Sequence, residues 1–362
     1  IMGGSASTRA AQGTPWATCE VGMEPVQGLQ GDTLRIITRA WDSHRASAAL
    51  MALVFTHVLN YRVELVNSLL LSESLGMLER GDADLDPEVW LRSQSDVNYE
   101  LYGFREGVED LGVAGYSGQS GLYLTPAVLD AGELENGLIG YETLFDPRAM
   151  GRLPVDERGD KSYKPFVRQN APCTALDDDG KGELCPKILH AIPAYDEGIV
   201  EGLVRGLGED GLNASVVYLG DDFERKVTKR VKAGEALVAY GWRPSTLVAS
   251  CKESELRRVQ LPEHGRTCVL RPWEKRNRYD CDFPTQSLRR LASSAGPLAM
   301  SRRNLARDVV LQMEVLDTDL MDMLRHMGKR RDGISKGEAA AEALARDAAC
   351  RWLQDADNQA RV

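Results

Sequence analysis

Motifs that would identify a common enzyme class are missing from this sequence. It has no Gly-x-Ser-x-Gly elbow, no phosphate-binding loop and no His-Glu-x-x-His motif. None of its five histidines has a sequence spacing from a candidate nucleophile that is typical of a catalytic pair. We therefore expect a binding protein with no catalytic residue, no metal and no cofactor. A thiol-dependent enzyme is the less favoured alternative.

Long apolar runs are also missing. The sequence contains no stretch of the roughly 18 apolar residues that a membrane span requires. Its first residues lack the charged segment and apolar stretch of a secretion signal. We expect residues 1–30 to be a flexible leader that precedes the folded part of the chain.

The sequence has fewer basic than acidic residues. The chain has 44 Lys and Arg against 54 Asp and Glu, which gives a formal net charge of -10. An acidic surface disfavours nucleic acid or an anionic membrane as partner. Apolar residues make up 43% of the 362 residues, so we expect a globular chain with two or three domain-sized cores.

Paired Cys-x-x-Cys motifs are absent, which disfavours a zinc site. Two of the seven cysteines, Cys173 and Cys185, bracket a polar loop and predict a disulfide. One more bridge is expected among Cys251, Cys268 and Cys281, and the odd count leaves at least one thiol unpaired. Disulfides indicate an extracellular or periplasmic setting, with buried free thiols as the alternative.

Three tryptophans stand out from this background because each follows a strand end or a turn: Trp41, Trp90 and Trp242. Indole faces attract a cation, and a quaternary ammonium cannot donate a hydrogen bond, so stacked rings can hold it without any acidic residue. The three residues therefore predict an aromatic cage. The competing interpretation is that each tryptophan packs in a core.

The periodicity predicts an α/β fold of two lobes. A β-rich run at 34–38, a helix at about 43–59 and a strand at 62–66 form a βαβ unit, with Trp41 at the carboxyl edge of its parallel sheet. A second α/β lobe has strands at 187–192, 214–219 and 236–240 and helices at 197–207 and 223–232. Three helices are expected at the end of the chain, over about 301–314, 317–327 and 336–352.

These elements predict the division of the chain. We expect 31–122 plus 246–362 to form the first lobe and 123–245 to form the second. The second lobe would contain an irregular insertion at about 146–186, which is rich in Gly, Pro and charge.

At this point the motifs carry a family resemblance. The chain resembles the glycine betaine and quaternary-ammonium substrate-binding proteins of ABC transporters, over roughly 33–126 and 187–250. The segments that resemble family signatures are Ala40–Ser43 followed by Asn60–Leu65, Gly81–Asp84 followed by Val89–Leu91, Gly121–Pro126 and Val238–Pro244. Three tryptophan motifs stand in the family's order.

The resemblance implies a type II periplasmic-binding-protein fold whose two lobes close on a ligand. It implies that Trp41, Trp90 and Trp242 surround an onium group, and that backbone N–H groups of Gly198 and Ile199, at a helix start, hold a carboxylate. Further expected site residues are Asp42, which we assign to helix capping or orientation, and Tyr195 at the pocket border.

The chain departs from the family where the carboxylate is held. Ser95 stands where the family often has a histidine, and Pro244 is followed by Ser-Thr instead of His-Trp. We therefore expect a weaker or rebuilt clamp, with Arg92, Arg243 or His44 as candidates. Choline, which has no carboxylate, stays open beside glycine betaine and dimethylsulfoniopropionate.

Two functions follow. The first is uptake or sensing of a betaine-like onium solute, with a membrane transporter or receptor component as partner. The second is an extracellular interaction domain on the same fold, with a degenerate pocket and a protein or peptide partner at the 146–186 insertion. Nucleic acid is expected in neither.

Overall fold

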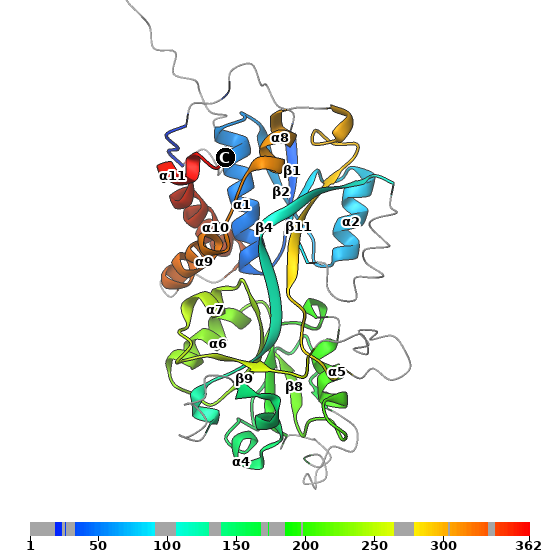
Figure 1. Ribbon diagram of the computed structural model, residues 1–362, viewed down its shortest axis with the longest axis vertical. Coiled ribbons are helices and arrows are strands. Elements are labelled where there is room, and N and C mark those ends of the chain that lie inside the picture. Colours follow the sequence, from blue (N-terminus) through cyan, green and yellow to red (C-terminus); the bar gives the residue numbers. More distant parts are fainter. Residues whose placement is uncertain are drawn as a thin grey trace, which may run out of the picture. The chain divides into compact units, whose positions relative to one another are not determined.

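The computed structural model describes residues 19–23, 26, 33–90, 106–129, 139–167, 173, 185–196, 198–263, 279–302, 305–331 and 337–362. The chain forms two compact units (Figure 1). The first unit comprises Ile1–Leu91, Tyr99–Tyr116 and Ser287–Val362, and the second comprises Arg92–Asn98 and Ser117–Gln286.

This division differs from the expected lobes at residues 92–98, 117–122 and 246–286, which belong to the second unit. For 246–286 the reason is strand pairing. Strand β10 (Arg257–Gln260) pairs antiparallel with the end of β4 (Val108–Leu124), and Arg258 binds the carboxylate of Asp282. Strand β4 itself runs from the first unit into the second, because the division falls after Tyr116.

The first unit is built on a sheet of mixed direction, with the strand order β2-β1-β3-β11-β4. Its first three strands are parallel, as a βαβ unit requires, and β11 is antiparallel to β3. Besides β4, the strands are β1 (Thr33–Thr38), β2 (Arg62–Asn67), β3 (Leu85–Val89) and β11 (Gln286–Ser293).

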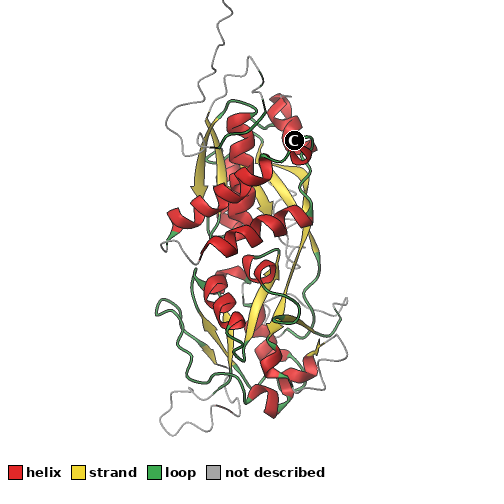
Figure 2. Ribbon diagram, turned by 90° about the vertical axis from the view of Figure 1, so that its left-hand side faces the viewer, coloured by secondary structure: helices red, strands yellow, loops and turns green. Residues whose placement is uncertain are grey.

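Helices cover both faces of this sheet (Figures 1 and 2). Helix α1 (Asp42–His57) is apolar nearly all round because it packs against the strands and also against α9 and α10. Helix α2 covers the other face, where Leu75 and Leu78 meet Ile37 and Leu291. The remaining helices are α2 (Leu71–Arg80), η6 (Met300–Arg302), α8 (Leu305–Gln312), α9 (Asp317–Arg331), α10 (Glu338–Leu353) and α11 (Ala356–Gln359).

The second unit has the strand order β4-β9-β7-β8-β6, with β10 pairing β4 and β5. Strand β7 is parallel to both β8 and β9, whereas β4 and β6 are antiparallel to their neighbours. The strands are β5 (Ile139–Gly140), β6 (Phe166–Val167), β7 (Lys187–His190), β8 (Ser215–Tyr218) and β9 (Val238–Arg243). The helices are η2 (Pro126–Val128), η3 (Tyr141–Phe145), α4 (Pro147–Met150), η5 (Pro193–Tyr195), α5 (Ile199–Gly206), α6 (Phe223–Lys232) and α7 (Thr246–Ser250).

The elements expected from periodicity are confirmed within a few residues at β1, α1, β2, α5, α6 and the C-terminal helices. Strands β3, β5, β6, β10 and β11 were not expected. Strand β3 reads Leu-Asp-Pro-Glu-Val, a composition typical of a loop, yet all five residues are buried. Strands β10 and β11 lie in a stretch of the chain for which no helix or strand was expected.

The described cysteines support an oxidising compartment. The expected Cys173–Cys185 disulfide is confirmed, and a second bridge, Cys19–Cys350, ties the N-terminal segment to α10. Cys281 is also disulfide-bonded, and Cys251 carries a free thiol. Most of the expected leader lies outside the described residues, as do 168–172 and 174–184 of the 146–186 insertion.

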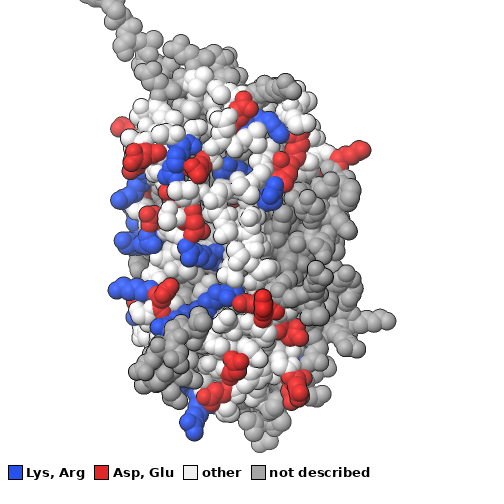
Figure 3. Space-filling view, in the orientation of Figure 1, with Lys and Arg blue, Asp and Glu red and all other residues white. Residues whose placement is uncertain are grey.

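The surface has mixed charge. On the face shown in Figure 3, Lys and Arg are interspersed with Asp and Glu.

Among the described helices, none has both the length and the apolar character to cross a bilayer.

Candidate functional site

A buried carboxylate, Glu88, connects two of the expected cage residues in the first unit. The indole N–H groups of Trp41 and Trp90 both donate to Oε1 of Glu88, each at 2.9 Å. Ser43 donates to the same oxygen at 2.7 Å, and Tyr116 donates to Oε2 at 2.9 Å. The structure therefore brings Trp41 and Trp90 together around one acceptor.

The strand order explains this meeting. Trp41 follows β1 and stands at the N-cap position of α1, and Trp90 directly follows β3. Because β1 and β3 are parallel neighbours, their carboxyl ends lie at the same edge of the sheet. Both indoles are partly exposed, whereas the Glu88 side chain beneath them is buried.

A second buried carboxylate, Asp86, lies two residues before Glu88 on β3 and forms an ion pair with Arg39 at 2.7 Å. His44 Nε2 lies 3.0 Å from the other oxygen of Asp86. Burial would raise the pKa of Asp86, but the Arg39 charge and the hydrogen bonds from His44 and Ser74 outweigh it, so the pKa is lowered. His44 is thus engaged in the core.

The guanidinium of Arg39 also lies over the ring of Trp41, 5.3 Å from its centroid. His44 approaches the same indole edge-on, with the ring centroids 5.5 Å apart. These contacts hold the plane of Trp41 from within the unit, and they show that its ring already accepts one cation.

Asp42 serves the packing of the first unit. Its carboxylate is 2% exposed and makes two hydrogen bonds with Arg331, at 2.6 and 2.7 Å. The pair joins the start of α1 to the end of α9. This placement favours the orienting role for Asp42 over direct ligand contact.

Trp242 and Tyr195 meet in the second unit. Trp242, on β9, is 5% exposed and lies edge-on to Tyr195 with centroids 5.6 Å apart. Its other ring neighbours are Phe223 at 6.0 Å and Tyr240 at 5.9 Å. Its indole nitrogen is buried and has no hydrogen-bond partner in the described part of the chain.

The backbone N–H groups expected to hold the ligand's carboxylate already bind a residue of the chain, Asp196. Gly198, at φ 90°, is the N-cap of α5, and its N–H donates to Oδ1 of Asp196 at 3.1 Å. The N–H of Val200 donates to the other carboxylate oxygen at 2.7 Å, and that of Ile199 donates to the Asp196 carbonyl. An internal carboxylate, 1% exposed, thus takes the place where we expected the ligand's carboxylate.

A buried polar cluster continues from Asp196. Its carboxylate lies 3.3 Å from His190 Nε2, and His190 stacks on Tyr240 at 4.5 Å. Tyr218 donates to Glu201, whose second carboxylate oxygen is buried without a partner among the described residues. Burial and the nearby Asp196 charge raise the pKa of Glu201.

Some expected site residues lie outside the described chain, namely Ser95 and Arg92. Arg243 is described and exposed. Glu88, Asp86 and Asp196 were not among the expected site residues. Glu88 could have been found from the sequence, because it is a charged residue two positions before Trp90 in a tryptophan motif.

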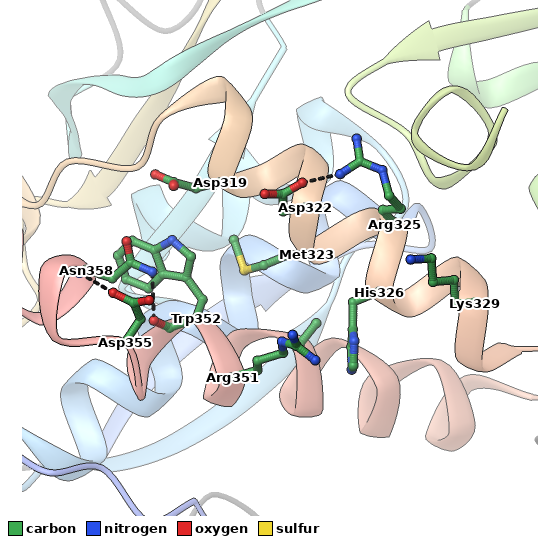
Figure 4. Close-up of a pocket in the computed structure, with 11 residues that line it drawn as sticks. Asp319, Asp322, Met323, Arg325, His326, Lys329, Arg351, Trp352, Asp355 and Asn358 are labelled. Carbon is green, nitrogen blue, oxygen red and sulfur yellow. Dashed lines mark hydrogen bonds and ion pairs between the residues drawn. The ribbon is translucent and has the colours of Figure 1, made fainter. Parts of the chain in front are cut away.

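A separate pocket of about 420 Å³ lies in the first unit between α9, α10 and α11 (Figure 4). None of the expected site residues lines it. Several of its charged residues are in ion pairs, such as Arg325 with Asp322 and His326 with Asp347. Among the described residues, no cluster of His, Cys, Asp or Glu is suited to a metal ion.

Comparison with known proteins shows similarity in structure and none in sequence. No protein family matches the chain, and no curated protein matches it by sequence. Among solved structures, lactococcal OpuAC in complex with glycine betaine is 12% identical, with a TM-score of 0.53 over 91% of this chain and 97% of that one.

Two further structures are similar. An ABC-transporter choline-binding protein in complex with choline is 15% identical, with a TM-score of 0.57 over 91% of this chain and 90% of that one. The glycine betaine/L-proline-binding protein ProX of Borrelia burgdorferi is 12% identical, with a TM-score of 0.54 over 87% and 92%.

These similarities confirm the fold. The chain has the α/β, type II periplasmic-binding-protein-like fold that the resemblance implied, the fold of the glycine betaine and choline substrate-binding proteins. At this level of identity the similarity defines the fold alone.

Proposed function

We propose that this protein binds a small quaternary-ammonium solute of the betaine and choline class. The observation that carries the proposal is the convergence of Trp41 and Trp90 on Glu88. Two partly exposed indoles, fixed at one sheet edge, offer electron-rich faces to a cation that cannot donate hydrogen bonds. The shared fold supports the same class of ligand.

Trp242 is proposed as the third indole of the cage, with Tyr195 beside it. The contact between these two rings supports a joint role. The indole nitrogen of Trp242 is buried without a partner among the described residues, and we propose that it donates to an oxygen of the ligand, because the onium group itself offers no acceptor. Ser95 keeps its proposed place in the same site.

The engaged N–H groups of Gly198 and Ile199 bear on the choice of solute. Since Asp196 already takes the amides at the start of α5, a ligand carboxylate would have to displace a buried one. We therefore propose that the onium group dominates recognition, and that choline-like solutes bind ahead of glycine betaine and dimethylsulfoniopropionate.

The cellular role follows from the ligand class. We propose a non-enzymatic solute-binding component for uptake or sensing, outside the cell or in a periplasm, that works with a membrane transporter or receptor. The disulfides Cys19–Cys350 and Cys173–Cys185 support an oxidising location.

A thermal-shift screen tests this proposal directly. The protein is heated alone and with choline, glycine betaine, dimethylsulfoniopropionate or glycerol. A ligand at 100 times its Kd adds about 2.7 kcal/mol of stability, which raises Tm by roughly a few degrees. We expect a rise with choline and none with glycerol. No rise with any onium solute would reject the proposed function.

A further inference from the structure

We propose that Glu88 determines the charge specificity of the onium site. Its buried negative charge would make the surface formed by Trp41 and Trp90 select a full cation over a neutral molecule of the same shape. This inference rests on the proposed function and adds a carboxylate to a cage that needs none in principle.

The partners of Glu88 are all neutral donors. Its carboxylate accepts from two indoles, from Ser43 and from Tyr116, with a weaker contact from Ser47 at 3.4 Å. An indole N–H can only donate, so Oε1 acts solely as an acceptor toward both rings. The hydroxyls of Ser47 and Tyr116 also lie 2.6 Å apart, so their two hydrogens serve both this bond and Oε2 of Glu88.

No cationic side chain of the described residues pairs with this carboxylate. The nearest candidate by contact is Arg39, whose Nη1 binds the backbone carbonyl of Glu88 at 3.2 Å. The charge of Arg39 is matched by Asp86 at 2.7 Å. A fully buried carboxylate with hydrogen bonds but no counter-ion is unusual, because burying an unpaired charge is costly.

A cationic ligand would supply the missing counter-charge. Bound on the outer faces of the indoles, it would be attracted by the carboxylate beneath them through a medium of low effective dielectric constant. The hydrogen bonds from the two N–H groups to an anion also push electron density into the rings. Both effects favour a cation and leave a neutral isostere unaffected.

The alternative is that Glu88 only positions the two rings. That role would act equally on every ligand that stacks on them. Glu88→Gln separates the two roles, because the amide keeps the size of the side chain and an acceptor oxygen for the indoles. Its NH2 group can donate to the hydroxyls of Ser47 and Tyr116, which can also accept.

The experiment is calorimetric titration with choline and with 3,3-dimethyl-1-butanol, in which carbon replaces the charged nitrogen. Wild type, Glu88→Gln and Ser47→Ala are compared, the last as a control that removes the weakest contact to Glu88 together with the Ser47–Tyr116 bond and keeps the charge. In Glu88→Gln we expect choline affinity to fall about tenfold or more and the affinity of the neutral alcohol to change less than about threefold.

The outcomes are distinct. Equal losses for both ligands in Glu88→Gln would overturn the inference and leave the proposed function in place. A wild-type protein that binds neither ligand would overturn both. If Glu88→Gln does not fold, equal affinity of the wild-type protein for choline and its neutral isostere would overturn the inference.

Discussion

Trp41 and Trp90 donate to one and the same atom, Oε1 of Glu88. The two residues follow neighbouring parallel strands, so the sheet brings them to one edge, and the carboxylate then fixes the orientation of both rings. A pair of indoles held in this way loses little freedom when a cation binds. The strand order thus sets the position of the two rings, and their orientation suits a cationic ligand.

Glu88 should be a major determinant of stability. Glu88→Leu removes the common acceptor of Trp41, Trp90 and Ser43 and leaves the Tyr116 hydroxyl with its bond to Ser47 alone. We expect a loss of about 1–3 kcal/mol in the free energy of unfolding, measured by urea denaturation. Glu64→Leu, at an exposed position of β2, is the control and should change it by less than about 0.5 kcal/mol. Equal effects of the two substitutions would contradict the account.

The Asp42–Arg331 pair should couple α1 to α9. A double-mutant cycle with Asp42→Asn and Arg331→Gln should give a coupling energy of about 1–3 kcal/mol, because the carboxylate is buried and bonded twice. The pair Arg80–Asp82 has exposed side chains and serves as the control, with a coupling within about 0.5 kcal/mol. A coupling near zero at Asp42 would show that α9 is held by other contacts.

Removing the internal carboxylate should change the ligand preference. Asp196→Ala frees the N–H groups of Gly198 and Val200 at the start of α5, which then suit a carboxylate from solution. We expect glycine betaine to gain affinity relative to choline, as read from calorimetric Kd ratios. Asp196→Asn retains one acceptor and should shift the ratio less. An unchanged ratio in Asp196→Ala would show that these amides do not contact the ligand.

Glu201 should make stability depend on pH. Burial and the Asp196 charge raise the pKa of Glu201 in the folded protein, so the folded state binds this proton more tightly than the unfolded state. Ionisation therefore costs stability as the pH rises through the folded pKa, and the cost is absent below the unfolded value near 4.5. Glu201→Gln should be more stable than wild type at pH 7, with the difference vanishing near pH 4. A constant difference across this range would contradict the assignment.

The sequence allowed the fold to be predicted where side-chain periodicity is simple. Helix α1, with its apolar residues between two parallel strands, is such a case, and Trp41 and Trp90 could be placed beyond strand ends for the same reason. Strand β3 could not be predicted, because two acids and Pro87 in five residues are typical of a loop. Glu88 and Asp86 can stand in a buried strand only because other buried side chains bind their carboxylates, and the sequence does not show those contacts.

Other features depend on contacts that sequence spacing does not reveal. The Cys19–Cys350 bridge joins residues 331 positions apart, so no local pattern predicts it. Asp196 lies only two residues before Gly198, but the expectation of a ligand at the helix start left no role for an internal cap. Charged residues that form buried hydrogen bonds and ion pairs are therefore the part of the site that could not be predicted from sequence patterns.

The most direct test of the central claim is a calorimetric titration of choline into wild type, Trp41→Leu and Trp90→Leu, with Trp352→Leu as the matched control. Trp352 belongs to the same unit and is buried in α10. Loss of one cation–π contact of about 2 kcal/mol predicts roughly 30-fold weaker binding in each of the first two variants and no change in the third. Unchanged choline affinity in both Trp41→Leu and Trp90→Leu would contradict the account.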